Sequence, residues 1–292
     1  MNIIDFRVRP PYKSFDNDWY FGDAVLAHYE HQGGRKVAES ARRRSMDLYL
    51  KEQQEAGIVH AVVTGRSGFG SGYEEVTEVS NDDIETLITN HLNHSNPSRK
   101  FSGVIGVDST DTERAIDQID RYITHGHCVG ITMECGFTSK PVRYDDRSLY
   151  PIYEKCVEAG AFVIFTAGNV YDRLSHASAE AFDQIAVDFP HLRLVLSHAG
   201  WPQLMPTIWV ALRHDNVWLL PDFYMFDAPG KDDFVYAINT MLRDRVMFGS
   251  CYPLISFADA IDSALHSGIH EDVLEDYLYG NAAQFLHLTE PI

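Results

Sequence analysis

The chain has 292 residues, 45% of them hydrophobic and 23% charged, and its 42 acidic and 24 basic residues give a formal net charge of -18. This composition is typical of a globular protein and excludes a disordered chain, a collagen and a coiled coil. An acidic surface repels phosphate groups and anionic lipids, so we expect neither nucleic acid nor a membrane among its partners.

Eight short apolar, β-branched runs recur along the chain, and each is followed by a segment with helical periodicity. We predict strands at 2–9, 58–65, 101–107, 129–134, 161–167, 192–198, 216–222 and 245–250. We predict helices at 35–56, 81–95, 111–126, 146–160, 176–189, 202–214, 231–243 and 256–266, with a last helix at 271–287. Near-continuous apolar strands are typical of parallel sheets buried on both faces.

This alternation predicts the α/β fold class and, within it, a (β/α)8 TIM barrel with an extra C-terminal helix. A doubly wound open sheet is the alternative. No linker or shift in composition divides the chain, so we expect residues 1–292 to form a single domain.

Two predicted connections exceed the usual two to six residues, at 10–34 after the first strand and at 66–80 after the second. Both leave strand carboxyl ends, where barrel enzymes keep their active sites. The first connection is rich in aromatic residues. It either covers a ligand, with Trp19 as a substrate-binding residue, or packs over the barrel top or an oligomer interface. The second contains SGFGSG, which lacks the Lys-Ser/Thr ending of a phosphate-binding loop and predicts a flexible loop instead.

Three arginines stand at the predicted strand ends of this acidic protein. Arg7 and Arg9 share one face of the first strand at a period of two, and Arg66 follows the second strand. Guanidinium groups stay charged and prefer planar anions, which predicts a site for a carboxylate or phosphate group. The alternative is that Arg7 and Arg9 pair with Glu134 and Asp222 inside the barrel, since a buried charge needs a partner.

The other strand ends carry groups suited to proton transfer and hydrogen bonding: Glu134, Thr166, His198, Asp222, Tyr224 and Cys251. His198 is the candidate general base, because an unperturbed imidazole titrates near neutrality. The alternative is an imidazole that only bonds within the barrel. Cys251 is a candidate nucleophile if neighbouring cations lower its pKa, and otherwise it is inert packing.

Several blocks of the sequence together resemble one family. They are IIDFRVRP, DDRSLYPIYEKCVEAGAFVIFTAG, FPHLRLVLSHAG, DRVMFGSCYP and YGNAAQFLHL, in this order over nearly the whole chain. The chain resembles the amidohydrolase-related branch of the amidohydrolase superfamily, which includes aminocarboxymuconate-semialdehyde decarboxylase and pyrone-dicarboxylate lactonase. The resemblance implies a metal-type (β/α)8 barrel, with the strand-6 histidine, here His198, as the base that activates water.

The sequence departs from this family at the metal positions. The family's Asp-x-His-x-His on strand 1 reads Asp5-Phe6-Arg7-Val8-Arg9, its strand-5 histidine is Thr166, and its strand-8 aspartate is Cys251. Arginine cannot ligate a cation, so we expect Arg7 and Arg9 to replace the charge of the metal. The alternative is a rearranged Zn²⁺ site of Cys251, His198 and Glu134.

We therefore expect an amidohydrolase-related hydrolase or carbon–carbon lyase that acts on a small carboxylated molecule and needs no cofactor. His198 moves the proton, Arg7 and Arg9 bind the carboxylate or oxyanion, and Glu134 or Asp222 orients one of these groups. Lactone hydrolysis and decarboxylation both stay open. A catalytically silent anion-binding barrel and a metal-dependent hydrolase are the alternatives.

The cellular setting is predicted from cysteine spacing and from the chain start. Four cysteines lie far apart and form no CxxC pair, which predicts a reduced, cytoplasmic environment. No apolar run reaches the length of a membrane span, and the first residues are neither a secretory signal nor a transit peptide. The family resemblance also makes a homodimer the expected assembly.

Overall fold

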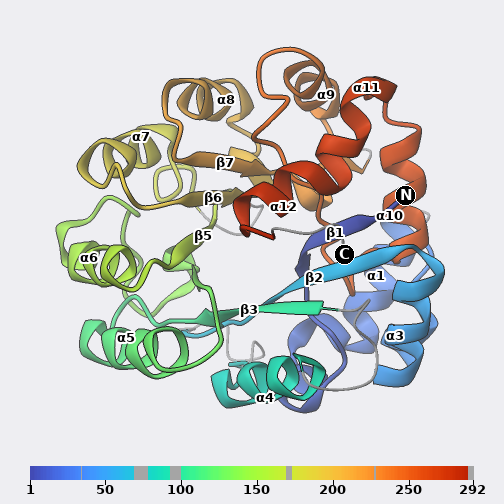
Figure 1. The fold of residues 1–292 in the computed structure, drawn as a ribbon, viewed down its shortest axis with the longest axis horizontal. Helices are drawn as coiled ribbons and strands as arrows, with labels where there is room; N and C mark the ends of the chain where they lie inside the picture. Colours follow the sequence, from blue (N-terminus) through green and yellow to red (C-terminus); the bar gives the residue numbers. More distant parts are fainter. Residues whose placement is uncertain (34, 69–77, 93–99, 169–172, 227, 289–292) are drawn as a thin grey trace.

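The computed structural model describes residues 1–33, 35–68, 78–92, 100–168, 173–226 and 228–288. Its sheet has seven parallel strands in sequence order, and the helices surround them in Figure 1. This order contradicts a doubly wound sheet, in which the strand order reverses. The strands are β1 (Ile3–Val8), β2 (Ile58–Thr64), β3 (Lys100–Gly106), β4 (Gly130–Met133), β5 (Phe162–Thr166), β6 (Leu194–Ser197) and β7 (Val217–Leu220).

The eighth predicted strand, 245–250, is not a regular strand. The segment nevertheless lies between β7 and β1, since parallel bridges join Leu219 to Val246 and Val8 to Tyr252. The backbone N–H of Phe6 also donates to the carbonyl of Phe248 at 2.9 Å. These contacts curl the seven-stranded sheet toward closure without an eighth ladder.

The helices follow the strands around the outside of the sheet. They are α1 (Asp23–Gly33), α2 (Glu39–Arg42), α3 (Met46–Glu55), α4 (Asn81–Leu92), α5 (Thr112–Ile119), α6 (Tyr150–Ala159), α7 (Ala179–Asp188), α8 (Leu204–Arg213), α9 (Lys231–Asn239), α10 (Phe257–Leu265), α11 (Glu271–Glu275) and α12 (Asn281–Phe285). A π-helical turn, Asp276–Gly280, connects α11 to α12.

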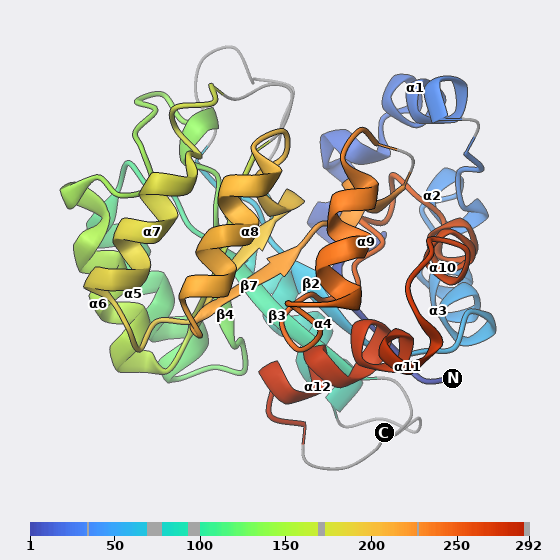
Figure 2. The ribbon, with the colours of Figure 1, turned by 90° about the horizontal axis from the view of Figure 1, so that it is seen from above.

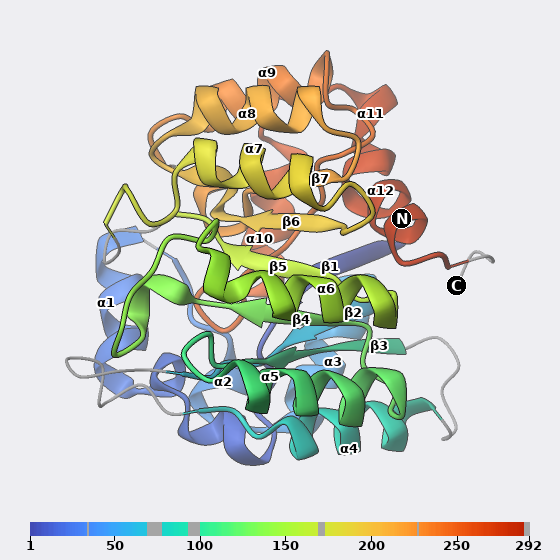
Figure 3. The ribbon, with the colours of Figure 1, turned by 90° about the vertical axis from the view of Figure 1, so that its left-hand side faces the viewer.

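The long connection after β1 is more ordered than the expected loop. It contains two 3-10 turns, Lys13–Asn17 and Trp19–Phe21, and then helix α1. Asp18 caps the second turn by accepting a hydrogen bond from the backbone N–H of Tyr20 at 3.4 Å. Figures 2 and 3 both place α1 at the opposite end of the molecule from the two termini. Because β1 starts at the N-terminus, α1 lies on the side of the strand carboxyl ends.

A hydrophobic core fills the inside of the curled sheet. Phe6 and Phe162 from the strands pack against Phe285 of α12, with ring centroids 5.4 and 4.9 Å apart. Helix α12 therefore closes the end of the sheet that carries the termini, and the carboxyl ends of the strands stay available for a site. No helix of the described residues is long and apolar enough to cross a membrane.

Candidate functional site

Arg7, His198 and Asp222 come together from three strand ends. The Arg7 Nη1 atom lies 2.7 Å from Asp222 Oδ2 and 3.2 Å from His198 Nε2. The Nδ1 atom of His198 lies 2.7 Å from Asp222 Oδ1. The hydroxyl of Ser197 also donates to Asp222, at 3.0 Å. A carboxylate at Nδ1 fixes the imidazole with its proton on Nδ1, which leaves Nε2 as the unprotonated nitrogen, facing Arg7 Nη1.

The charges of this group are set by burial and by its neighbours. Burial lowers the pKa of His198, and the adjacent Arg7 opposes protonation further, although Asp222 acts in the opposite direction. Burial opposes ionisation of Asp222, but His198 and Arg7 hold its pKa below the usual value. A neutral imidazole beside an ionised carboxylate is the arrangement of a general base.

Cys251 lies beside this group, with its Sγ atom 3.7 Å from Arg7 Nη1. Burial raises the pKa of its thiol to about 11, although Arg7 partly offsets the effect. The thiol is therefore protonated at neutral pH. This does not support the nucleophile predicted for Cys251, because the thiolate is the reactive form.

Arg66, Glu134 and Thr166 form a second group at the neighbouring strand ends. Arg66 donates from Nε and Nη2 to the two oxygens of Glu134, at 3.1 and 3.4 Å. The hydroxyl of Thr166 donates to Glu134 Oε1 at 3.1 Å. Burial opposes ionisation of Glu134, but Arg66, Arg9 and Arg7 hold its pKa below the usual value. Glu134 is therefore ionised and engaged with Arg66.

The end of β3 lets Arg66 approach this position. A Cβ atom at Gly106 would lie 2.5 Å from the carbonyl carbon of Arg66, a distance that real side chains do not reach. The side chain of Asn81 holds the same glycine by two hydrogen bonds of 3.0 Å to its backbone. Glycine at 106 is therefore required for the backbone of Arg66 to pass so closely.

Arg9 takes different partners from Arg7, although the sequence places them on one face. Its Nε atom lies 3.9 Å from Asp18 Oδ2, and its guanidinium carbon lies 4.8 Å from the ring centroid of Tyr20. Arg66 packs on the same tyrosine at 4.7 Å. The pairing of β1 with β2 is irregular between Asp5 and Val8. Such an irregularity re-aims side chains, and the period-two expectation does not describe the partners of these two arginines.

Three segments of the site have left-handed backbone at residues other than glycine. The φ angles are 65° at His198, 46° at Ala199, 40° at Asp222 and 58° at Cys251. Each such conformation costs about 1–3 kcal/mol and persists only where the surrounding structure imposes it. Three of these residues contact Arg7, and the fourth, Ala199, follows His198 in the chain. Backbone strain of this kind clusters at functional sites.

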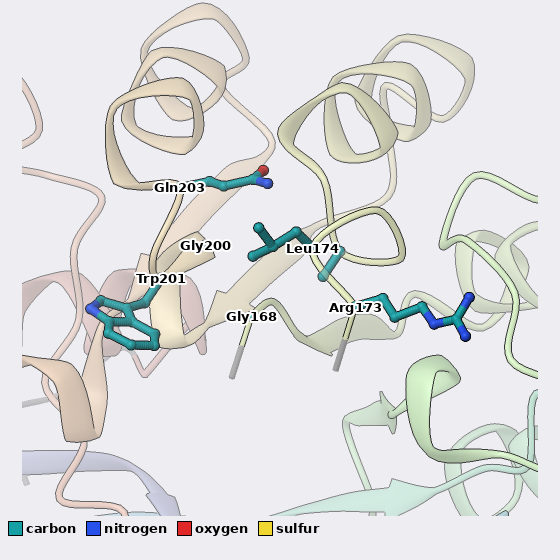
Figure 4. Close-up of a pocket in the computed structure, with 7 residues that line it drawn as sticks. Gly168, Arg173, Leu174, Gly200, Trp201 and Gln203 are labelled. Carbon is teal, nitrogen blue, oxygen red and sulfur yellow. The ribbon is translucent and has the colours of Figure 1, made fainter. Parts of the chain in front are cut away.

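An aromatic stack supports His198 from one side. Tyr224 meets the imidazole edge to face at 5.2 Å, and Trp201 stacks on Tyr224 at 4.5 Å. Trp201 also lines a small pocket. The side chain of Leu174 points toward Trp201, and that of Arg173 points away from it (Figure 4). The pocket is lined by Gly168, Arg173, Leu174, Ala177, Gly200, Trp201 and Gln203, so it does not include the residues that contact Arg7.

The comparisons with known proteins agree with this barrel-like arrangement. Residues 45–288 match the family model described as Amidohydrolase. The chain belongs to the amidohydrolase family. No curated protein matches it in sequence.

Solved structures resemble this chain over nearly its full length. An uncharacterized TIM-barrel protein from Bordetella bronchiseptica is 32% identical, with a TM-score of 0.88, over 98% of this chain and 99% of that one. Dihydroxybenzoic acid decarboxylase from Polaromonas, with bound manganese, is 15% identical, with a TM-score of 0.69, over 100% and 98%. 4-Oxalomesaconate hydratase from Rhodopseudomonas palustris is 18% identical, with a TM-score of 0.62, over 97% and 94%.

A metal of the kind bound by that decarboxylase does not fit the residues present in this chain. Within the described ranges, no three His, Cys, Asp or Glu side chains gather into a metal-binding group. The nitrogen of Arg7 instead lies among His198, Asp222 and Cys251. A guanidinium group offers no lone pair to a cation and repels it. Cys251, His198 and Glu134, the alternative Zn²⁺ ligands, do not gather into one metal-binding group among the described residues.

The structure brings most of the predicted site residues into two adjoining groups. One contains Arg7, His198, Asp222 and Cys251, with Tyr224 beside it; the other contains Arg66, Glu134 and Thr166. Arg9 pairs with Asp18 and shares this acid and the ring of Tyr20 with Arg66. Trp19 contacts the ring of Tyr20, with centroids 5.0 Å apart, and no contact places it on the arginines. The SGFGSG stretch lies mostly outside the described residues.

Sequence reasoning missed Asp18 and chose Trp19 over Tyr20. Tyr20 contacts two arginines directly, and Asp18 is the acid that pairs with Arg9. The sequence signal was present, because an aspartate two residues before a tyrosine in a connection after strand 1 can cap a turn. It was not sufficient, because many aspartates cap turns without reaching a buried cation.

Proposed function

We propose that this member of the amidohydrolase family is a lyase that decarboxylates a small hydroxylated carboxylic acid without a metal. The observation that carries the proposal is the contact of Arg7 with both members of the His198–Asp222 pair. This arrangement supplies a permanent cation and a neutral base at one point. The decarboxylase among the structural neighbours supports this reaction class.

The proposed reaction needs one proton carrier and one fixed positive charge. His198 Nε2 accepts the proton of a substrate hydroxyl on the carbon next to the one that bears the carboxylate. His198 then returns this proton to the carboxylate-bearing carbon. The carbon–carbon bond breaks, its electron pair stays with the organic product, and CO2 leaves. A solvent proton restores the hydroxyl. Arg7 stabilises the negative charge that develops on the substrate oxygen.

Release of CO2 from a panel of hydroxybenzoates and hydroxylated unsaturated acids tests the proposal. We expect turnover by the wild-type protein and no opening of carboxylated lactones. Lactone hydrolysis without CO2 release would replace the lyase by the hydrolase. Tight binding of these acids without any turnover would instead indicate a silent anion-binding barrel.

Metal removal is expected to leave this activity intact. Protein treated with a chelator and then dialysed should contain far less than one equivalent of divalent metal by plasma mass spectrometry, and its turnover should equal that of the untreated protein. The physical reason is that Arg7 already supplies the positive charge beside His198. Activity that disappears with the chelator and returns with added Mn²⁺ or Zn²⁺ would contradict metal independence.

The activity should depend on pH through His198. Because burial and Arg7 lower its pKa, the imidazole stays neutral below the usual value of 6.5. The base form is the reactive form, so kcat/KM should rise with pH in a step centred below pH 6.5 and then stay level through neutrality. A pH series measured where circular dichroism reports a folded protein checks this. A step centred above pH 6.5 would mean that the resting imidazole is protonated.

A further inference from the structure

Arg9 differs from the other two buried arginines at the strand ends. Arg7 and Arg66 each donate hydrogen bonds to a carboxylate, that of Asp222 and that of Glu134. Arg9 is 1% exposed, yet its Nε atom has no hydrogen-bond partner in the described chain, and the acid that pairs with it, Asp18, lies 3.9 Å away. Buried polar groups are almost always hydrogen-bonded, so this guanidinium has an unused donor.

Asp18, the nearby acid, is also incompletely bonded. It is 2% exposed, its Oδ1 atom accepts only from the backbone of Tyr20 at 3.4 Å, and its Oδ2 atom has no hydrogen-bond partner in the described residues. Asp18 also lies 3.6 Å from Arg66. At such distances Asp18 balances the charge of Arg9 in part and leaves its Nε–H donor without a hydrogen bond in the described residues.

Arg9 does not belong to the proton-transfer group of Arg7, His198 and Asp222, but it lies in the same site. Arg9 follows Arg7 by two residues, which along an extended strand is about 6.6 Å. Tyr20 packs on Arg9 and Arg66, and repulsion from Arg7 lowers the pKa of Arg9, so the three cations lie close together. A molecule held by Arg7 beside His198 can therefore extend to Arg9.

We propose that Arg9 is a second anion subsite and that the substrate carries two acidic groups, one bound at Arg7 and the other at Arg9. The first of these assignments rests on the proposed function, whereas the second rests on Arg9 alone. A guanidinium group with a free donor pairs best with a planar carboxylate, which accepts two of its N–H groups.

The electrostatic balance of the three arginines supports this assignment. Despite burial, nearby anionic groups raise the pKa of Arg7 and of Arg66 above the usual value. Burial lowers the pKa of Arg9, and repulsion from Arg7 and Arg66 adds to the effect. A carboxylate bound at Arg9 would offset both unfavourable contributions.

Binding of two matched probes tests the subsite without any need for turnover. Glutarate and valerate have five carbons each, and only glutarate has a second carboxylate. We expect the wild-type protein to bind glutarate at least tenfold more tightly by calorimetry at constant ionic strength, which corresponds to about 1.4 kcal/mol. R9M should lose this preference and keep its affinity for valerate. R43M, at an exposed arginine that pairs with Glu39, makes the same change of charge and should keep the preference.

A second variant protects the test against a fold defect in R9M. D18N removes the negative charge beside Arg9 and should strengthen glutarate binding about three- to tenfold, whereas damage to the fold would weaken it. Equal binding of the two probes by the wild type, or a preference that survives in R9M, would overturn the subsite. Loss of turnover on every tested acid, with an Arg9-dependent preference intact, would overturn the proposed function alone.

Discussion

Replacement of His198 by asparagine is expected to lower kcat about 10²- to 10⁴-fold, the usual contribution of a positioned acid–base group. Asparagine retains a side-chain N–H that can bond to Asp222, so Asp222 and Arg7 keep their contact. The affinity for a non-reacting substrate analogue should therefore change only a few-fold. Steady-state kinetics and calorimetry on the same preparation measure the two quantities.

A matched variant separates this effect from the loss of any histidine. His266 is exposed at the end of α10 and contacts only Asp262 in the described structure, so H266N should retain wild-type turnover. Full activity in H198N would show that His198 is not the base. A large loss of analogue affinity in H198N would indicate a binding role in place of proton transfer.

Replacement of Arg7 by methionine is expected to have the largest effect on stability. Arg7 and Asp222 are both buried and in contact at 2.7 Å, so the substitution leaves a buried carboxylate without its cation. Breaking such a pair costs about 3–5 kcal/mol of the free energy of unfolding. Urea unfolding followed by circular dichroism measures this loss, and turnover should also fall because the substrate oxyanion loses its cation.

The double variant R7M/D222N tests the reason for this loss. If the cost comes from the uncompensated charge of Asp222, removal of that charge should restore a substantial part of the stability but none of the activity. R43M, which breaks an exposed ion pair, should change the free energy of unfolding by less than about 1 kcal/mol. A double variant as unstable as R7M alone would assign the cost to lost packing around Arg7.

The sequence determined the order of the elements and the residues that stand at the strand ends. Apolar runs such as 161–167 and 192–198 are strands because their side chains are buried on both faces, and the structure has strands at Phe162–Thr166 and Leu194–Ser197. The carboxyl ends of parallel strands meet at one end of the sheet. Period and position were therefore enough to select Arg7, His198 and Asp222 for one site.

The sequence overestimated the eighth strand and underestimated the connection after the first. The run 245–250 is apolar because it is buried between β7 and β1, but its backbone makes only isolated bridges. A strand within a sheet and a buried extended segment are both apolar because both are buried. The apolar pattern therefore cannot distinguish the two. The turns and the helix at 13–33 have weak local signals and depend on packing over the strand ends.

Only the tertiary structure decided which acid each arginine meets. The sequence offered Glu134 and Asp222 as partners for Arg7 and Arg9, whereas Asp222 pairs with Arg7 and Glu134 with Arg66. Arg9 meets Asp18, which comes from a turn that the strand pattern does not predict. The choice of partner depends on distances of a few ångströms between side chains far apart in the chain, because electrostatic energies change steeply over that range. It also depends on the irregular register of β1.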